Sequence, residues 1–147
     1  MKCIVLMKAS ASSEAGVMPS EQLLTEMGTF NEELVNAGIM LSGEGMHPSS
    51  AGVRVHFGDG EPRAEHGPFS EGKELVAGFW MWQVASMDEA IAWAKRIPNT
   101  DGEHGNVEIR PVFEAEDFGE EFTPELQEQE VRLREAMEQK QQQQQQQ

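Results

Sequence analysis

Residues 74–84, which read ELVAGFWMWQV, decide the fold. The segment is apolar at both alternating sets of positions: Leu75, Ala77, Phe79 and Met81 form one set, and Val76, Gly78, Trp80 and Trp82 form the other. Successive side chains of a strand point to opposite faces of a sheet, so this strand would be buried on both faces. The stretch therefore predicts a central strand with other structure packed on each side of it.

Two segments on either side of this strand have apolar residues at helical spacing. The first begins after Ser20 and ends at Gly38, and the second begins after Ser86 and ends at Pro98. Serine is a favoured helix N-cap, glycine supplies the left-handed stop, and proline cannot continue a helix. We therefore expect one helix before the central strand and one after it.

The remaining strands are shorter. Residues 2–7 (KCIVLM) and 106–115 (NVEIRPVFEA) are extended apolar or alternating segments. Residues 53–57 alternate apolar and polar side chains, and the GDGE turn that follows is typical of a hairpin with a weaker returning arm. Residues 40–52, by contrast, are predicted to form mainly a glycine-rich loop.

The order of elements is strand, helix, strand with hairpin, strand, helix, strand. This order is typical of an α+β, ferredoxin-like βαββαβ fold with an antiparallel sheet. Both helices would cover one face of the sheet, while the central strand is apolar on the opposite face too. Because a large uncovered apolar face usually marks an interface, we expect a homodimer that packs through the sheet face. The alternative is that the carboxy-terminal segment of the same chain folds back over the sheet.

Composition excludes several classes of partner. The 147 residues carry a formal net charge of -15 with only 11 lysines and arginines, so nucleic acid and anionic membrane surfaces are poor partners. No stretch approaches the roughly 20 apolar residues of a transmembrane helix, and we expect a cytoplasmic protein. Cys3 is the only cysteine and suits the core.

The composition changes after Phe113. Residues 114–147 hold ten acidic and three basic side chains, a net charge of -7. Thr123 and Pro124 are a typical helix start, so an acidic helix is predicted there. The closing glutamine run is predicted to be disordered. The expected organisation is a domain over 1–113 and an acidic helical extension over 114–147.

Three segments together resemble the YCII-related family, in the branch called DGPF after its own tetrapeptide. They read NEELVNAGIMLSGEGMHPSSAGVRVHFGDGE (31–61), HGPFSEGKELVAGFWMWQVASMDEAIAWAKRIP (66–98) and VEIRPV (107–112), and the resemblance covers roughly residues 1–113. It implies a dimeric α+β barrel of ferredoxin-like subunits. It also implies possible enzymatic activity through a His/Asp pair.

The sequence departs from the family pattern where the tetrapeptide begins, because His66 replaces the aspartate and gives HGPF. An imidazole titrates near neutrality, so it can act as a general acid or base if a second group holds it. We predict His66 as the catalytic group, with Glu74 as its carboxylate partner; Glu44 and Glu71 are alternatives. Loss of activity, with His66 serving only in the turn, is the competing interpretation.

Other residues are candidates for ligand binding: His47, Glu44, Arg54, His56 and Trp80. Arg54 and His56 alternate with Val53 and Val55, so they would line the inner side of the sheet if the valines face the helices. No metal or other cofactor is predicted, because the histidines lack a recognised ligand spacing.

The sequence thus predicts an enzyme-like dimer that binds an unknown small organic ligand in a cavity at the sheet face. The alternative is a ligand-binding or accessory module without catalysis, since related domains occur beside transcription sigma factors. A third possibility is an assembly protein that acts through its acidic tail. Nothing in the spacing selects a substrate.

Overall fold

The structure is a computed structural model that describes residues 1–70 and 74–146. The chain divides into two compact units, Met1–Val112 and Phe113–Gln147, and each is described by itself. No helix within the described residues is both long enough and apolar enough to cross a bilayer.

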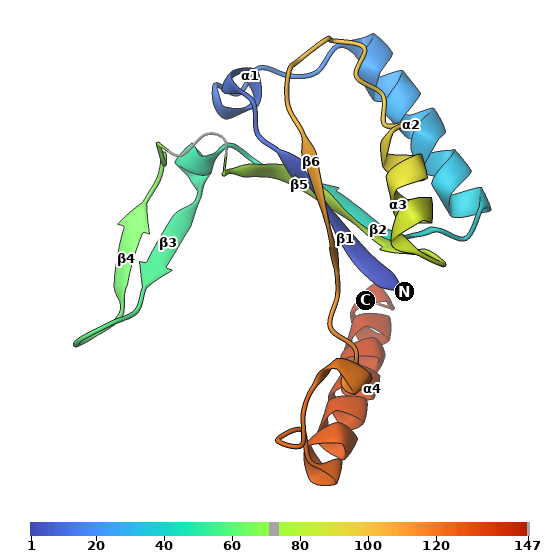
Figure 1. Ribbon diagram of the computed structural model, residues 1–147. Coiled ribbons are helices and arrows are strands. Elements are labelled where there is room, and N and C mark those ends of the chain that lie inside the picture. The colour runs from blue at the N-terminus through green and yellow to red at the C-terminus, as the bar shows by residue number, and fades with distance from the viewer. Residues whose placement is uncertain (71–73, 147) are drawn as a thin grey trace. The chain divides into compact units, whose positions relative to one another are not determined.

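A four-stranded antiparallel sheet forms the first unit. It contains β1 (Lys2–Lys8), β2 (Met40–Gly45), β5 (Val76–Gln83) and β6 (Val107–Pro111) in the order β2-β5-β1-β6 (Figure 1). This is the strand order of a ferredoxin-like fold, so the predicted fold class is confirmed. β5 lies between β2 and β1, which confirms that residues 74–84 contain a central strand.

Two helices, α2 (Glu21–Asn36) and α3 (Met87–Ala94), lie on one side of this sheet (Figure 1). The hydroxyl of Ser20 accepts the Leu23 N–H at 3.1 Å, and the hydroxyl of Ser86 accepts the Glu89 N–H at 3.2 Å. Both predicted N-caps are therefore present.

The core fills the space between sheet and helices. Register pairs Cys3 with Trp82 and Val5 with Trp80, and all four side chains point to the helices. Their partners there are Phe30, Leu34 and Ala90. Burial raises the pKa of the Cys3 thiol, which fits its expected place in the core.

The two buried tryptophans differ in their polar contacts. The indole N–H of Trp80 donates to Asn31 Oδ1 at 2.9 Å. The indole N–H of Trp82, in contrast, meets no acceptor among the described residues. A buried donor without a partner costs about 1–3 kcal/mol, so the second ring is held by packing alone.

The second strand of the sheet is not the one that the sequence predicts. β2 fills that position, although its residues are expected to be a glycine-rich loop. Gly43 explains the difference, because a Cβ at this residue would lie 2.8 Å from Cδ1 of Trp80. Glycine weakens a strand by itself but allows β2 to approach the tryptophan ring closely.

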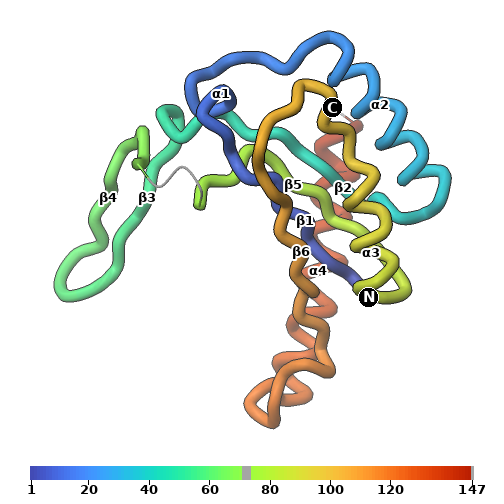
Figure 2. Tube along the Cα trace, turned by 45° about the horizontal axis from the view of Figure 1, so that its top comes forward, coloured from blue at the N-terminus to red at the C-terminus, as the bar shows by residue number. Residues whose placement is uncertain are grey.

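The segment predicted for that position forms a separate hairpin. Within residues 1–70 and 74–146, β3 (Val53–His56) and β4 (Arg63–His66) pair only with each other and stand apart from the main sheet (Figure 2). The side chains expected to face the helices are exposed instead: Val53 is 51% exposed, Val55 53% and Phe57 82%. The expectation that Arg54 and His56 line the sheet is therefore wrong.

The face of the sheet opposite the helices is called the open face below. Two rows of paired residues cross it from β2 to β6. The first row is Glu44, Phe79, Leu6 and Glu108, and the second is Ser42, Met81, Ile4 and Arg110. The four apolar side chains in the middle are only partly buried and do not belong to the core.

Short helices complete the described chain. The segment after β1 contains the single turn α1 (Ala11–Glu14), and η1 (Ser49–Ala51) lies between β2 and β3. In the second unit, η2 (Ala115–Asp117) precedes α4 (Pro124–Gln145). α4 continues through the glutamines to Gln145 rather than ending in a disordered run, because glutamine is a good helix former.

Candidate functional site

A hydrogen-bonded cluster at the base of the hairpin, called the Ser49 clamp here, ties three segments together. The Glu14 carboxylate accepts the Ser49 N–H at 2.9 Å through Oε1 and the Ser49 hydroxyl at 2.5 Å through Oε2. The Phe69 N–H donates to the Ser49 Oγ at 3.0 Å. The clamp therefore joins α1, η1 and the turn that follows β4.

Gly67 lies against this clamp, within the HGPF tetrapeptide. Its N–H donates to the Gly52 carbonyl oxygen at 3.0 Å, and its peptide bond to Pro68 is cis. A Cβ at Gly67 would lie 1.8 Å from the Ser49 carbonyl oxygen, so no larger residue fits without moving the backbone. This contact holds the neighbouring His66 beside the connection that carries His47.

The Glu14 carboxyl is charged at neutral pH. The Ser49 hydroxyl and then the Ser49 N–H lower its pKa, since both donate to the ionised form. A carboxylate with two such donors is a weak proton acceptor. Both of its oxygens accept hydrogen bonds from Ser49, so the carboxylate holds the turn.

The hairpin separates two groups of predicted site residues. Residues directly opposite each other in an antiparallel pair share a face. Arg54 faces Glu65 across the hairpin, and His56 Nε2 lies 3.6 Å from Glu65 Oε1 on that same face. His66 is opposite Val53, on the other face. His66 and Arg54 are thus not brought to one side of the hairpin.

Arg54 is already engaged within the chain. Its guanidinium lies 4.0 Å from the centre of the Phe69 ring, a cation–π contact. The clamp fixes the backbone of Phe69, so the clamp also supports Arg54.

The other predicted residues lie on separate elements. Glu44 is exposed on the open face, directly opposite Phe79. Trp80 is 5% exposed and belongs to the helix-covered face. His47 is exposed after β2, and Glu74 is exposed before β5. The alternative carboxylate Glu71 lies outside the described residues.

Sequence reasoning missed the clamp and one ion pair. Glu14 and Ser49 are 35 residues apart, and neither lies in a recognised motif. The ammonium of Lys8 lies 3.6 Å from a Glu108 carboxylate oxygen, and the Lys8 side chain is only 13% exposed. A lysine that ends an apolar strand was the available signal, because its stem is expected to cover apolar surface.

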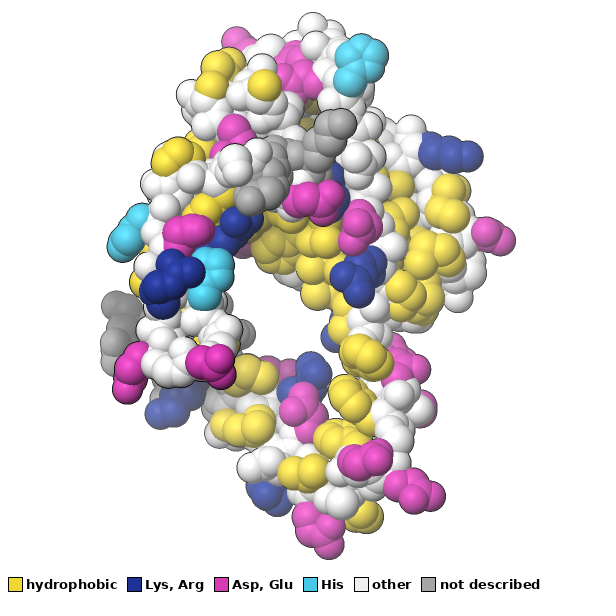
Figure 3. All heavy atoms as spheres, turned by 60° about the vertical axis from the view of Figure 1, so that its left-hand side comes forward, with side chains coloured by type: hydrophobic (Ala, Val, Ile, Leu, Met, Phe, Trp, Pro, Cys, Tyr) yellow, Lys and Arg dark blue, Asp and Glu magenta, His cyan; other side chains and the backbone are white. Residues whose placement is uncertain are grey.

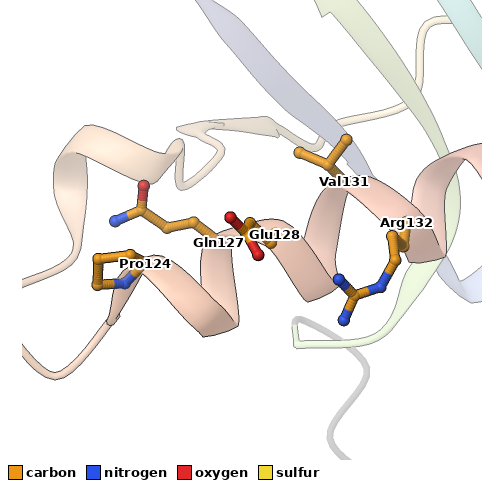
Figure 4. A pocket seen from close by; sticks show the side chains of 5 residues that line it. All are labelled: Pro124, Gln127, Glu128, Val131 and Arg132. Atoms are coloured by element: carbon orange, nitrogen blue, oxygen red, sulfur yellow. The ribbon is translucent and has the colours of Figure 1, made fainter.

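Two surface depressions of the described chain lie elsewhere. One is lined by residues of α4 alone, as Figure 4 shows: Pro124, Gln127, Glu128, Val131 and Arg132. Another lies between α2 and Met40. Neither contains a predicted site residue, and a groove along one helix does not enclose a ligand. The described residues also hold no group of three metal-ligating side chains.

The Ser49 clamp is expected to stabilise the fold at neutral pH and to lose this effect in acid. An unfolded glutamate has a pKa of about 4.3, and the folded pKa of Glu14 is lower. The contribution of Glu14 to stability is therefore complete above the unfolded pKa and is lost as pH falls through the folded pKa. We expect Glu14→Gln to lower the melting temperature at neutral pH and the difference from wild type to shrink below about pH 4. Glu61→Gln, in the hairpin turn, is the matched control, and a difference that grows in acid would contradict the clamp.

The sequence of this chain is similar to a known domain family and to a protein of known sequence. Residues 1–116 match the YCII-related domain. An uncharacterized protein of Rhizobium meliloti (strain 1021) is 29% identical over 92 residues, which cover 63% of this chain and 74% of that protein.

One solved structure is similar at lower identity. It is 5-chloro-2-hydroxyhydroquinone dehydrochlorinase (TftG) from Burkholderia phenoliruptrix AC1100 in complex with 2,5-dihydroxybenzoquinone, at 15% identity and a TM-score of 0.46. The match covers 79% of this chain and 97% of that one. The family match spans most of the chain, including the sheet, both helices and the Ser49 clamp. The chain therefore belongs to the YCII-related domain family.

Proposed function

We propose that this protein is a homodimer that binds a small organic molecule between the open faces of its two subunits, with His66 as the proton-transferring group. The observation that carries the proposal is the composition of the open face. Its centre is apolar, formed by Ile4, Leu6, Phe79 and Met81, and polar groups stand at both edges of the sheet. Ligand sites commonly combine an apolar floor with a few polar groups that orient the ligand.

The charge of the open face supports the same proposal. Lys2, Lys8 and Arg110 lie on it with Glu44 and Glu108, so this face has a net charge of +1. The whole chain carries -15. Figure 3 shows hydrophobic side chains exposed beside charged ones on the side of the molecule that carries the hairpin. An anionic ligand with a flat apolar body fits such a surface best.

The exposed apolar centre of this face supports the dimer. The helices of the first unit lie on the other side of the sheet (Figure 1), so they leave the four apolar side chains for a partner. A second copy that packs sheet to sheet brings an identical apolar surface. Stable dimers bury apolar side chains in this way, with charged groups at the rim.

Met81→Glu tests the sheet-to-sheet interface. A carboxylate in the middle of an apolar interface has no partner and loses its water, which costs several kcal/mol. We expect this variant to elute as a monomer in size-exclusion chromatography with light scattering, while the wild type elutes as a dimer. Leu24→Glu is the matched control, because Leu24 is 55% exposed on α2. If both variants keep the mass of a dimer, the interface lies elsewhere.

The class of ligand is tested with two probes of one shape. Arg110 is exposed on the open face, directly opposite Ile4, so its guanidinium is the group that we expect to meet an anion. Isothermal titration calorimetry should show tighter binding of 2-naphthoate than of the neutral 2-naphthol. Arg110→Gln should raise the dissociation constant of 2-naphthoate roughly tenfold, because the substitution removes one charge-assisted hydrogen bond. Arg63→Gln, on the hairpin, should leave the affinity for both probes unchanged. Equal affinity of the wild type for the two probes would refute an anion site.

The role of His66 separates an enzyme from a binding module. For a bound compound that is turned over, His66→Asn should lower kcat by about 10²–10⁴, the usual contribution of a general acid or base. Affinity should stay within about twofold, since the substitution keeps size and polarity. An unchanged kcat would remove the catalytic role and favour the module that binds without catalysis.

A further inference from the structure

The β3–β4 hairpin, called the arm below, carries an apolar face that its own chain leaves exposed. Val53 and Val55 alternate with polar residues on β3, and Phe57 continues the same alternation past the end of the strand. These side chains are 51%, 53% and 82% exposed. Exposed valine and phenylalanine at consecutive positions on one face are unusual for a surface that only meets water.

The arm has little support within its own chain. β3 pairs with β4 alone, and neither strand joins the main sheet. The contacts that hold it, Gly67 to Gly52 and the Ser49 clamp, are all at its base. An isolated two-stranded hairpin is at best marginally stable in water, so the rest of the arm needs a surface to pack against.

The position of the arm indicates which surface that is. In both Figure 1 and Figure 2 the arm projects from the side of the sheet opposite α2 and α3. That is the side of the open face, where the proposed dimer places the second subunit. An arm that projects there must run beside the partner.

The area of the open face leads to the same partner. A four-stranded sheet is about 19 Å across and five residues are about 17 Å long, so the flat outline of the shared face is about 320 Å². The accessible area of its side chains is larger than this outline, and a stable interface buries about 800 Å² of accessible area on each partner. The sheet face alone is therefore a small interface, and the arms of the two subunits are the next apolar surfaces on that side.

We propose that the apolar face of the arm packs against a second copy of this chain, and that this contact brings His66 to the boundary between subunits. His66 belongs to this face because it lies directly opposite Val53. In one subunit its side chain is exposed. Contact with the partner encloses it, so the site around His66 is complete only in the dimer. This inference rests on the proposed homodimer.

A double substitution on the arm tests the contact. Val55→Thr with Phe57→Ser removes apolar surface but keeps a strand-forming residue at position 55. We expect the dimer dissociation constant, measured by sedimentation velocity on the full chain, to rise by about tenfold or more. The matched control is His56→Thr with Arg63→Thr on the opposite face of the arm, which should change the constant by less than about twofold.

A second measurement does not depend on how well these variants fold. The photoreactive p-benzoylphenylalanine in place of Phe57 should yield a covalent dimer on irradiation of the full chain, and the same group in place of His56 should not. Arm variants that leave the dissociation constant unchanged, or irradiation that gives no dimer from position 57, would overturn the inference while the dimer itself stands. A wild-type chain that remains monomeric would instead refute the proposed function on which the inference rests.

Discussion

The antiparallel register of β5 is the constraint on which the rest of the structure depends. Pairing with β1 places Trp80 opposite Val5 and Trp82 opposite Cys3 on the face that the helices cover. The same register places Phe79 and Met81 on the open face. Side chains of a strand alternate strictly, so a chain that has helices for one face cannot bury both sets with them. The apolar composition of the second set is what makes the open face a candidate for binding another molecule.

The glycines show how the fold reaches the proposed site. Gly43 allows β2 to lie against the Trp80 ring, and this places Glu44 on the open face beside Phe79. Gly67 packs against the Ser49 carbonyl group, and this fixes His66 at the base of the arm. In both cases a missing side chain at one position determines where a charged or titratable neighbour lies.

The local parts of this fold could be read from the sequence. The Ser20 and Ser86 caps, the hairpin turn and the central strand each depend on a pattern within a few residues, and the structure has all of them. β2 could not be predicted from the sequence. It forms a strand because it packs against the ring of Trp80, some 37 residues away, and not because its own residues favour a strand. The arm was misplaced for the related reason that alternation predicts a strand but not the sheet to which it belongs.

The candidate site was less predictable than the fold. His66 and Glu44 were identified by type, but their places follow from register and from the Ser49 clamp. The clamp joins Glu14 to Ser49 and Phe69, three residues that no local pattern connects. The indole ring of Trp80 made it a reasonable candidate for ligand contact. The alternation of side chains along β5, however, points Trp80 toward the helices and into the core. Side-chain chemistry is visible in a sequence, whereas the face that a side chain occupies depends on the pairing of distant strands.

The central claim is that the open face is covered by a second copy of the chain. Sedimentation velocity on the full-length wild type, across a dilution series from tens of micromolar to below one micromolar, tests it most directly. A mass that corresponds to two chains at the higher concentrations, falling toward one chain on dilution or remaining at two, supports the claim. The mass of a single chain at every concentration would contradict it.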